Sequence, residues 1–195
     1  MLTMSKWLNW GINCLIVFFR FGIVAAYAML IYPLSDLLLT FQRELPQNIM
    51  HSDDFLRLPG QNTVTAGAIQ SFPSWPYAIL ILIGTLIFIW AMIKNLKSLT
   101  IILKNIQQAD YFSITNEKAL KQLVIANVVI IVSDLFLAGG NQLTRSWFYL
   151  IGNTGILAST WSTVASDAWH AITLGIIYLI YHYTLTLKTE NDLTI

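Results

Sequence analysis

Long blocks of apolar residues alternate with shorter polar stretches along this chain of 195 residues. A helix needs roughly 20 apolar residues to cross the hydrocarbon core of a membrane, because no water is available there to satisfy the backbone. Four blocks meet or approach this length, and they predict spans over residues 12–39, 76–93, 122–138 and 168–187. The pattern predicts an all-α chain that forms one integral membrane domain, a four-helix bundle.

Local signals refine the ends of these spans. Arg20 interrupts the first block, so the first span begins either before or just after it. Ala26, Tyr27 and Ala28 resemble a signal-peptide cleavage site with small residues at its first and third positions, but the arginine and the apolar residues farther along favour a retained span. Pro76 suits the first turn of the second helix. Gly139 and Gly140 suit the end of the third helix, so we expect it to stop there.

Composition supports a membrane protein. The chain is 56% hydrophobic and 11% charged, with a mean hydropathy of +0.63, whereas soluble domains carry roughly 25% charged residues. The 11 basic and 10 acidic residues nearly cancel, so no global field attracts nucleic acid, and we expect no direct nucleic-acid binding. A single cysteine, Cys14, excludes an intramolecular disulfide and a thiolate-rich metal site.

The basic residues are unevenly distributed around the spans. Arg43, Arg57 and Arg145 lie in the segments 40–75 and 139–167, and the other eight lie on the opposite side: Lys6, Arg20, Lys94, Lys97, Lys104, Lys118, Lys121 and Lys188. Because cytoplasmic segments are enriched in lysine and arginine, both termini and the inner loop 94–121 are predicted to be cytoplasmic. A fifth span within residues 145–166 would place the C-terminus outside, and we reject it.

The inner loop has helical periodicity. Apolar residues recur at spacings of three and four over residues 96–106, which predicts an amphipathic extension of the second helix. The extension breaks around Ala109 and Asp110, and Ser113 or Thr115 then caps a helix that enters the third span. This hairpin is either a basic anchor on anionic lipid or a docking surface for a cytoplasmic protein. The candidate docking residues are Lys97, Lys104, Asp110, Phe112, Ser113, Asn116 and Lys121.

The same loop carries a family resemblance. The run from Asn105 to Ala126 resembles the signature of small bacterial four-helix membrane proteins catalogued as domain of unknown function 2975, through Asp110, Phe112, Ser113, Asn116, Leu120 and Lys121. In that family the signature joins the second and third spans, and a glycine commonly stands at the position of Ala109. The resemblance implies a bacterial cytoplasmic membrane and, through gene context, a small helix-turn-helix DNA-binding regulator as partner.

Four ionisable residues near the outer ends of the spans form a second candidate site. A charge within hydrocarbon costs at least about 2.5 kcal/mol, so each such residue needs an explanation. Asp36, Asp134, Asp167 and His170 are predicted to form one polar layer in the outer leaflet. The layer either locks helices together by hydrogen bonds or forms a proton-sensitive or ligand-binding site through the histidine. We hypothesise that Asp134 and His170 are coupled.

Signals for catalysis, cofactors and metals are weak. The sequence has no phosphate-binding loop, no dinucleotide fingerprint, no H-E-x-x-H and no G-x-S-x-G. His170 and His182 are roughly 18 Å apart on a straight helix, too far to ligate one haem iron. His51 with Asp53 and Asp54 is a weak metal cluster, because loop acids beside one histidine are usually solvated. We therefore expect no catalytic residue, cofactor or bound metal.

The sequence favours a non-enzymatic membrane sensor, or a regulatory partner of a cytoplasmic protein, with the bilayer as its solvent. A small transport protein or a toxin-immunity protein is the alternative, and a membrane enzyme comes third because no nucleophile and base pair is visible. Gly22 and Ala26 form a small-x-x-x-small pair that permits close helix contact. Formation of a homo-oligomer stays open.

Overall fold

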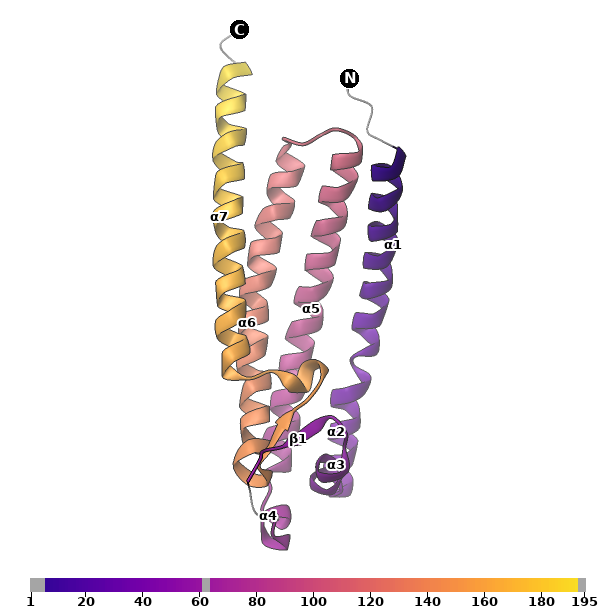
Figure 1. The fold of residues 1–195 in the computed structure, drawn as a ribbon, viewed down its shortest axis with the longest axis vertical. Helices are drawn as coiled ribbons and strands as arrows, with labels where there is room; N and C mark the ends of the chain where they lie inside the picture. Colours follow the sequence, from indigo (N-terminus) through magenta and orange to yellow (C-terminus); the bar gives the residue numbers. More distant parts are fainter. Residues whose placement is uncertain (1–5, 61–63, 193–195) are drawn as a thin grey trace. The chain divides into compact units, whose positions relative to one another are not determined.

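The computed structural model describes the chain except residues 1–5, 61–63 and 193–195 (Figure 1). The long helices are α1 (Lys6–Ala28), α2 (Ile31–Gln42), α5 (Ser74–Gln107), α6 (Ile114–Phe148) and α7 (Trp161–Asp192). The shorter elements are α3 (Leu45–His51), β1 (Phe55–Arg57), α4 (Ala66–Gln70), β2 (Leu150–Gly152) and the 3-10 helix η1 (Gly155–Ala158). Within the described residues, four helical stretches are long and apolar enough to cross a membrane: α1 with α2, α5, α6 and α7. The predicted all-α class is confirmed, and the described chain has four helical stretches that could span a membrane.

The helices are longer than the predicted spans. Arg20 lies inside α1, which begins at Lys6, and the first stretch continues as α2 after a break at residues 29 and 30. α5 runs on to Gln107, as its amphipathic pattern predicts, because side chains at spacings of three and four keep one apolar face along the extension. The inner segment 94–121, predicted as a helical hairpin, is helical at both ends, and the outer segment 139–167, predicted as a loop, is also helical at both ends.

The predicted stop at Gly139 and Gly140 is wrong, because α6 continues through both residues to Phe148. A Cβ atom on Gly140 would lie 2.7 Å from Cδ1 of Ile81, whereas one on Gly139 would lie 3.8 Å from Leu80. At Gly140 the missing side chain lets α5 approach closely. This packing and the continuous helical hydrogen bonds outweigh the roughly 1 kcal/mol by which glycine disfavours a helix.

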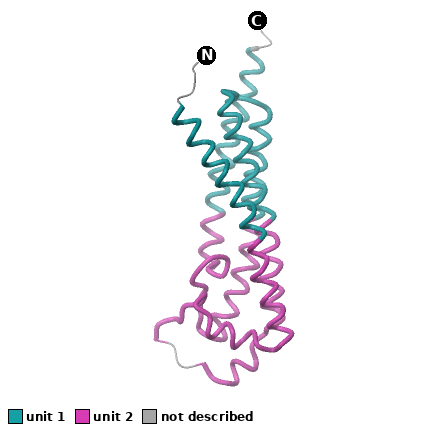
Figure 2. The backbone as a smooth tube through the Cα atoms, turned by 90° about the vertical axis from the view of Figure 1, so that its right-hand side faces the viewer, with its two compact units in different colours: residues 1–27, 90–129, 168–195 teal, residues 28–89, 130–167 magenta. Residues whose placement is uncertain are grey.

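The chain divides into two compact units, which Figure 2 distinguishes by colour. Unit 1 comprises residues 1–27, 90–129 and 168–195, and unit 2 comprises residues 28–89 and 130–167. In unit 1, a Cβ atom on Gly22 of α1 would lie 3.1 Å from Leu96 of α5, so α1 and α5 touch at the predicted small residue. Asn127 of α6 donates to Asn95 of α5 at 3.3 Å. Hydrogen bonds of this kind hold helices together in a membrane, where apolar side chains contact lipid as readily as they contact another helix.

Unit 2 has an ordered apolar core built largely from the two segments between the spans. Phe72 stacks on Phe148 with ring centroids 4.6 Å apart. β1 pairs with β2 in antiparallel register, with Leu56 opposite Ile151, so the two segments are hydrogen-bonded to each other. Residues 40–75 hold short elements only, as predicted, but the segment contributes to a core that consists of Leu45, Ile49, Phe72, Tyr77, Ala78, Ile81, Leu137, Phe148 and Leu150.

Apolar side chains remain exposed on the long helices. Of the most apolar window in each stretch, 11% is buried in α1 with α2 and 6% in α7, against 44% in α5 and 39% in α6. Phe21, Trp169 and Ile180 are each more than half exposed. Water disfavours so much apolar surface, whereas lipid chains accept it. The outer helices therefore have the surface expected of lipid-facing spans.

Candidate functional site

The predicted docking loop is the turn between α5 and α6 in unit 1, here called the α5–α6 turn (residues 108–113). α5 ends as predicted near Ala109, whose φ of 58° places it in the left-handed region. The amide of Asp110 then donates to the carbonyl of Asn105 at 2.9 Å, which closes the helix end. Ser113 caps α6, because its Oγ accepts the amide hydrogen of Asn116 at 3.3 Å. Of the two predicted caps, Ser113 is the one used.

Asn116 holds this turn together. Its side chain is 3% exposed. Its Nδ2 donates to the carbonyls of Asp110 at 2.9 Å and Tyr111 at 3.2 Å. Its Oδ1 accepts from Nδ2 of Asn105 at 2.7 Å. One side chain thus fixes the end of α5, the turn itself and the start of α6, because a buried amide that forms all these bonds tolerates one arrangement of its neighbours.

α7 braces the same turn from the other side. The hydroxyl of Tyr181 accepts the amide hydrogen of Ser113 at 2.9 Å and lies 2.9 Å from the carbonyl of Tyr111, to which it donates. The ring of Phe112 stacks on that of Tyr181, with centroids 5.9 Å apart. Phe112 remains 46% exposed and Ile114 remains 59% exposed. The turn is therefore rigid in its backbone and presents apolar side chains outward.

Charge is segregated between the two units. All eight basic residues predicted to be cytoplasmic belong to unit 1, where four acidic residues accompany them. Unit 2 holds the other three basic residues and six acidic ones. Three candidate docking lysines, Lys97, Lys104 and Lys121, are all exposed in unit 1. Unit 1 is therefore net basic and unit 2 net acidic.

A contact between a histidine and a glutamate near the turn could not be found from the sequence. Nδ1 of His182 in α7 lies 2.6 Å from Oε1 of Glu117 in α6. The histidine ring also lies beside Tyr178, with centroids 6.0 Å apart. Residues 65 positions apart give no local pattern, so only knowledge that α6 and α7 are neighbours would have found the pair.

Of the predicted polar layer, Asp36, Asp134 and Asp167 belong to unit 2, and His170 belongs to unit 1. Asp134 is 3% exposed, and its carboxyl lies within hydrogen-bonding reach of Asp167 and Ser159, all in unit 2. Its Oδ2 has no hydrogen-bond partner in the described part of the chain. His170 is an exposed residue of unit 1, and its coupling to Asp134 stays a prediction. The structure thus brings together Asp134 and Asp167.

Asp36, the remaining member of that layer, lines a cavity of about 330 Å³ in unit 2. Asp54, which follows α3, lines the same cavity and accepts a hydrogen bond from Oγ of Ser52 at 2.9 Å. Tyr77 of α5 contributes a third polar side chain. His51, grouped with Asp54 as a weak metal cluster, instead places Nδ1 2.7 Å from the carbonyl of Gln47. No group of three metal-binding side chains is found among the described residues.

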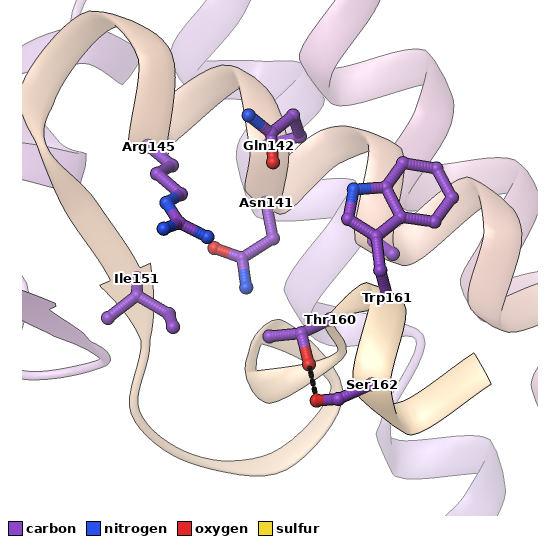
Figure 3. Close-up of a pocket in the computed structure, with 8 residues that line it drawn as sticks. Asn141, Gln142, Arg145, Ile151, Thr160, Trp161 and Ser162 are labelled. Atoms are coloured by element: carbon purple, nitrogen blue, oxygen red, sulfur yellow. Dashed lines mark hydrogen bonds between the residues drawn. The ribbon is translucent and has the colours of Figure 1, made fainter. Parts of the chain in front are cut away.

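A second cavity of about 260 Å³ lies between the end of α6 and the start of α7 (Figure 3). Arg145 extends toward the side chain of Asn141, while Thr160 and Ser162 bond to each other at 2.7 Å. Asn141 is already committed, because it donates to the carbonyl of Ser159 at 2.9 Å and accepts from the amide of Gly152 at 3.0 Å. Several side chains that line this cavity therefore already form hydrogen bonds within the protein.

Comparison with known proteins places most of the chain in one family. The family model described as Protein of unknown function (DUF2975) matches residues 60–195. That range includes the α5–α6 turn and begins after α3 and β1. No curated protein and no solved structure matches the chain.

Proposed function

The chain belongs to the family described as Protein of unknown function (DUF2975), as the resemblance of its inner loop indicated. Because this family has no assigned function, we propose one from the residues of this chain. The protein is a multi-pass, non-enzymatic membrane adaptor of the bacterial cytoplasmic membrane. Its α5–α6 turn docks a cytoplasmic protein, and the family's gene context makes a small helix-turn-helix DNA-binding regulator the partner to test first.

One observation carries this proposal: the family signature residues build a rigid turn that leaves aromatic and apolar side chains exposed. Asn116 ties the backbone, and Tyr181 braces it from α7. The exposed fractions of Phe112 and Ile114 are 46% and 59%. A surface fixed before binding loses little conformational freedom on association, which favours affinity. Exposed aromatic side chains are common energetic centres of protein interfaces.

The segregation of charge supports the orientation. Unit 1 holds both chain ends, the α5–α6 turn and eight basic residues. Since cytoplasmic segments are enriched in lysine and arginine, this charge supports a cytoplasmic location for the chain ends and the α5–α6 turn. The exposed lysines around the turn also favour an acidic surface on the partner and raise the rate of encounter at low salt.

The test is capture of the regulator encoded beside the gene, with the tagged full-length protein in detergent. Phe112→Ala should reduce capture at least tenfold, because an aromatic centre of an interface contributes about 2 kcal/mol or more. Charge reversal at Lys118 and Lys121 should weaken capture and flatten its dependence on salt.

Matched controls separate docking from general damage. Phe21→Ala removes an equally large exposed ring from α1 of the same unit and should leave capture unchanged. Lys188→Glu reverses an exposed charge on α7 and should have little effect. If Phe112→Ala binds as wild type does, or if the two phenylalanine variants lose capture equally, the α5–α6 turn is not the docking surface.

A small transport or toxin-immunity protein is the second candidate, because unit 2 contains a cavity lined by the carboxyl groups of Asp36 and Asp54. Carboxylates in a cavity near the outer end of the spans suit passage or capture of a cation. Deletion of the gene would then change cation uptake or raise sensitivity to a toxin. An adaptor would instead change expression of the regulator's target genes and leave both properties unaltered.

A further inference from the structure

The cavity beside Asp36 is formed by segments far apart in sequence. Its walls come from α2, α3, the start of β1, the first turns of α5 and η1, all within unit 2. Its volume of about 330 Å³ lies in the range of small-molecule sites. A single bound water takes roughly 30 Å³, so a bare ion would leave most of this space unfilled.

The polar groups that line the cavity are acidic or neutral. Asp36 and Asp54 contribute carboxyl groups, and none of the described residues that line the cavity is a lysine, arginine or histidine. The carboxyl group of Asp36 has no hydrogen bond or ion pair within the described chain. The carboxyl groups of both residues line the same cavity. Like charges in a common cavity repel, and a cation between them relieves that repulsion.

Tyr77 independently indicates a ligand. Its side chain is 1% exposed and packs against Phe72, with ring centroids 5.6 Å apart. It also lines the cavity, together with Asp36 and Asp54. That hydroxyl has no hydrogen-bond partner among the residues that the structure describes. A hydroxyl at the wall of a cavity can both donate and accept a hydrogen bond, so a polar molecule in the cavity would give it a partner.

We propose that this cavity binds a small organic cation with an ammonium group. Asp36 and Asp54 hold the charge, and the Tyr77 hydroxyl accepts or donates a further hydrogen bond. Tyr32 and Phe55 line the same space and add apolar surface for the carbon skeleton of such a ligand. In the proposed adaptor, the bound cation would be the signal. Only this biological role rests on the proposed function, because binding itself can be measured on the protein alone.

Binding is tested with the detergent-solubilised full-length protein and a panel of benzylamine, putrescine and choline. Benzyl alcohol is the matched control for benzylamine, because it has the same ring and no charge. At least one amine should bind saturably, and benzyl alcohol should bind at least tenfold more weakly than benzylamine when benzylamine is the ligand. Asp36→Asn and Asp54→Asn should each weaken amine binding tenfold or more, and Tyr77→Phe should weaken it severalfold.

Asp53→Asn is the matched control variant, because Asp53 is exposed, adjacent in sequence and absent from the cavity wall. It should bind as wild type does. Protection of the Asp36 carboxyl of the wild-type protein from carbodiimide labelling by the bound amine gives a measurement that needs no variant. The proposal is overturned if no amine binds, if Asp53→Asn acts like Asp36→Asn, if labelling is unprotected, or if Ca²⁺ saturates the site in place of amines. If the wild-type protein binds no amine but still captures the regulator, this site is refuted and the adaptor proposal stands.

Discussion

Replacement of Asn116 by alanine is the sharpest test of the α5–α6 turn. The substitution removes the two hydrogen bonds to the carbonyls of Asp110 and Tyr111 and the bond from Asn105. It also shortens a side chain that is 3% exposed. The backbone segments that this amide joins then lose their common attachment, although the helices on either side keep their own hydrogen bonds.

The expected cost follows from these bonds. A hydrogen bond contributes about 1 kcal/mol net, and a buried partner left unsatisfied costs about 1 to 3 kcal/mol. The turn lies at the end of two helices, where water reaches part of the freed groups. We therefore expect Asn116→Ala to lower the free energy of unfolding by about 2 to 4 kcal/mol.

The assay is reversible unfolding by SDS in mixed micelles, combined with hydrogen exchange of the amides at residues 108–116. Asn127→Ala is the matched control, because it lies on the same helix and its amide joins Asn95 at 3.3 Å and its own helix at Leu123. It should cost about 1 kcal/mol. The reasoning fails if Asn116→Ala costs no more than the control, or if exchange in the turn is unchanged.

Three further predictions use the same unfolding assay. Ala109→Gly should stabilise the protein by about 1 kcal/mol, because a φ of 58° strains any residue with a Cβ atom; a loss of stability would contradict this. Gly84→Ala should destabilise the protein by about 1 to 3 kcal/mol, since its Cβ would lie 2.7 Å from a leucine side chain. Gly139→Ala, whose nearest contact would lie at 3.8 Å, should instead raise the stability by about 0.5 to 1 kcal/mol. Equal effects of the two substitutions would refute the packing argument. The hypothesis that Asp134 and His170 are coupled predicts about 0.5 kcal/mol or more of interaction between Asp134→Asn and His170→Ala in a double-mutant cycle, and additive effects would end it.

The spans were predictable because their signal is local. Apolar runs located all four long helical stretches, and the pattern after residue 96 located the end of α5. The error at Gly139 and Gly140 arose because glycine serves two purposes. It ends helices where φ must be positive, and it lets helices touch where a neighbour approaches closely. The distance from Gly140 to Ile81 decides between these purposes, and sequence spacing does not contain it.

The candidate sites were predictable only in part, for a similar reason. The inner loop emerged from local patterning, and Asn116 and Ser113 do connect there. The acidic residues were grouped by their depth along each helix, which says nothing about which helix faces which. The cavity that Asp36 lines is shared with Asp54, which lies in a segment without a predicted long helix or strand. The partnership of Tyr181 with the turn likewise depends on α7 lying beside it.

The pairing of β1 with β2 sets a time before which unit 2 cannot finish folding. Leu56 is made 95 residues before its partner Ile151, which is roughly 5 to 20 s of translation at ordinary rates. During that interval β1 has an open edge, while α5 and α6 are still being made. The core of unit 2 therefore cannot close until α6 and Leu150 have been made, so a ribosome that stalls before residue 150 leaves a chain without the finished core of unit 2.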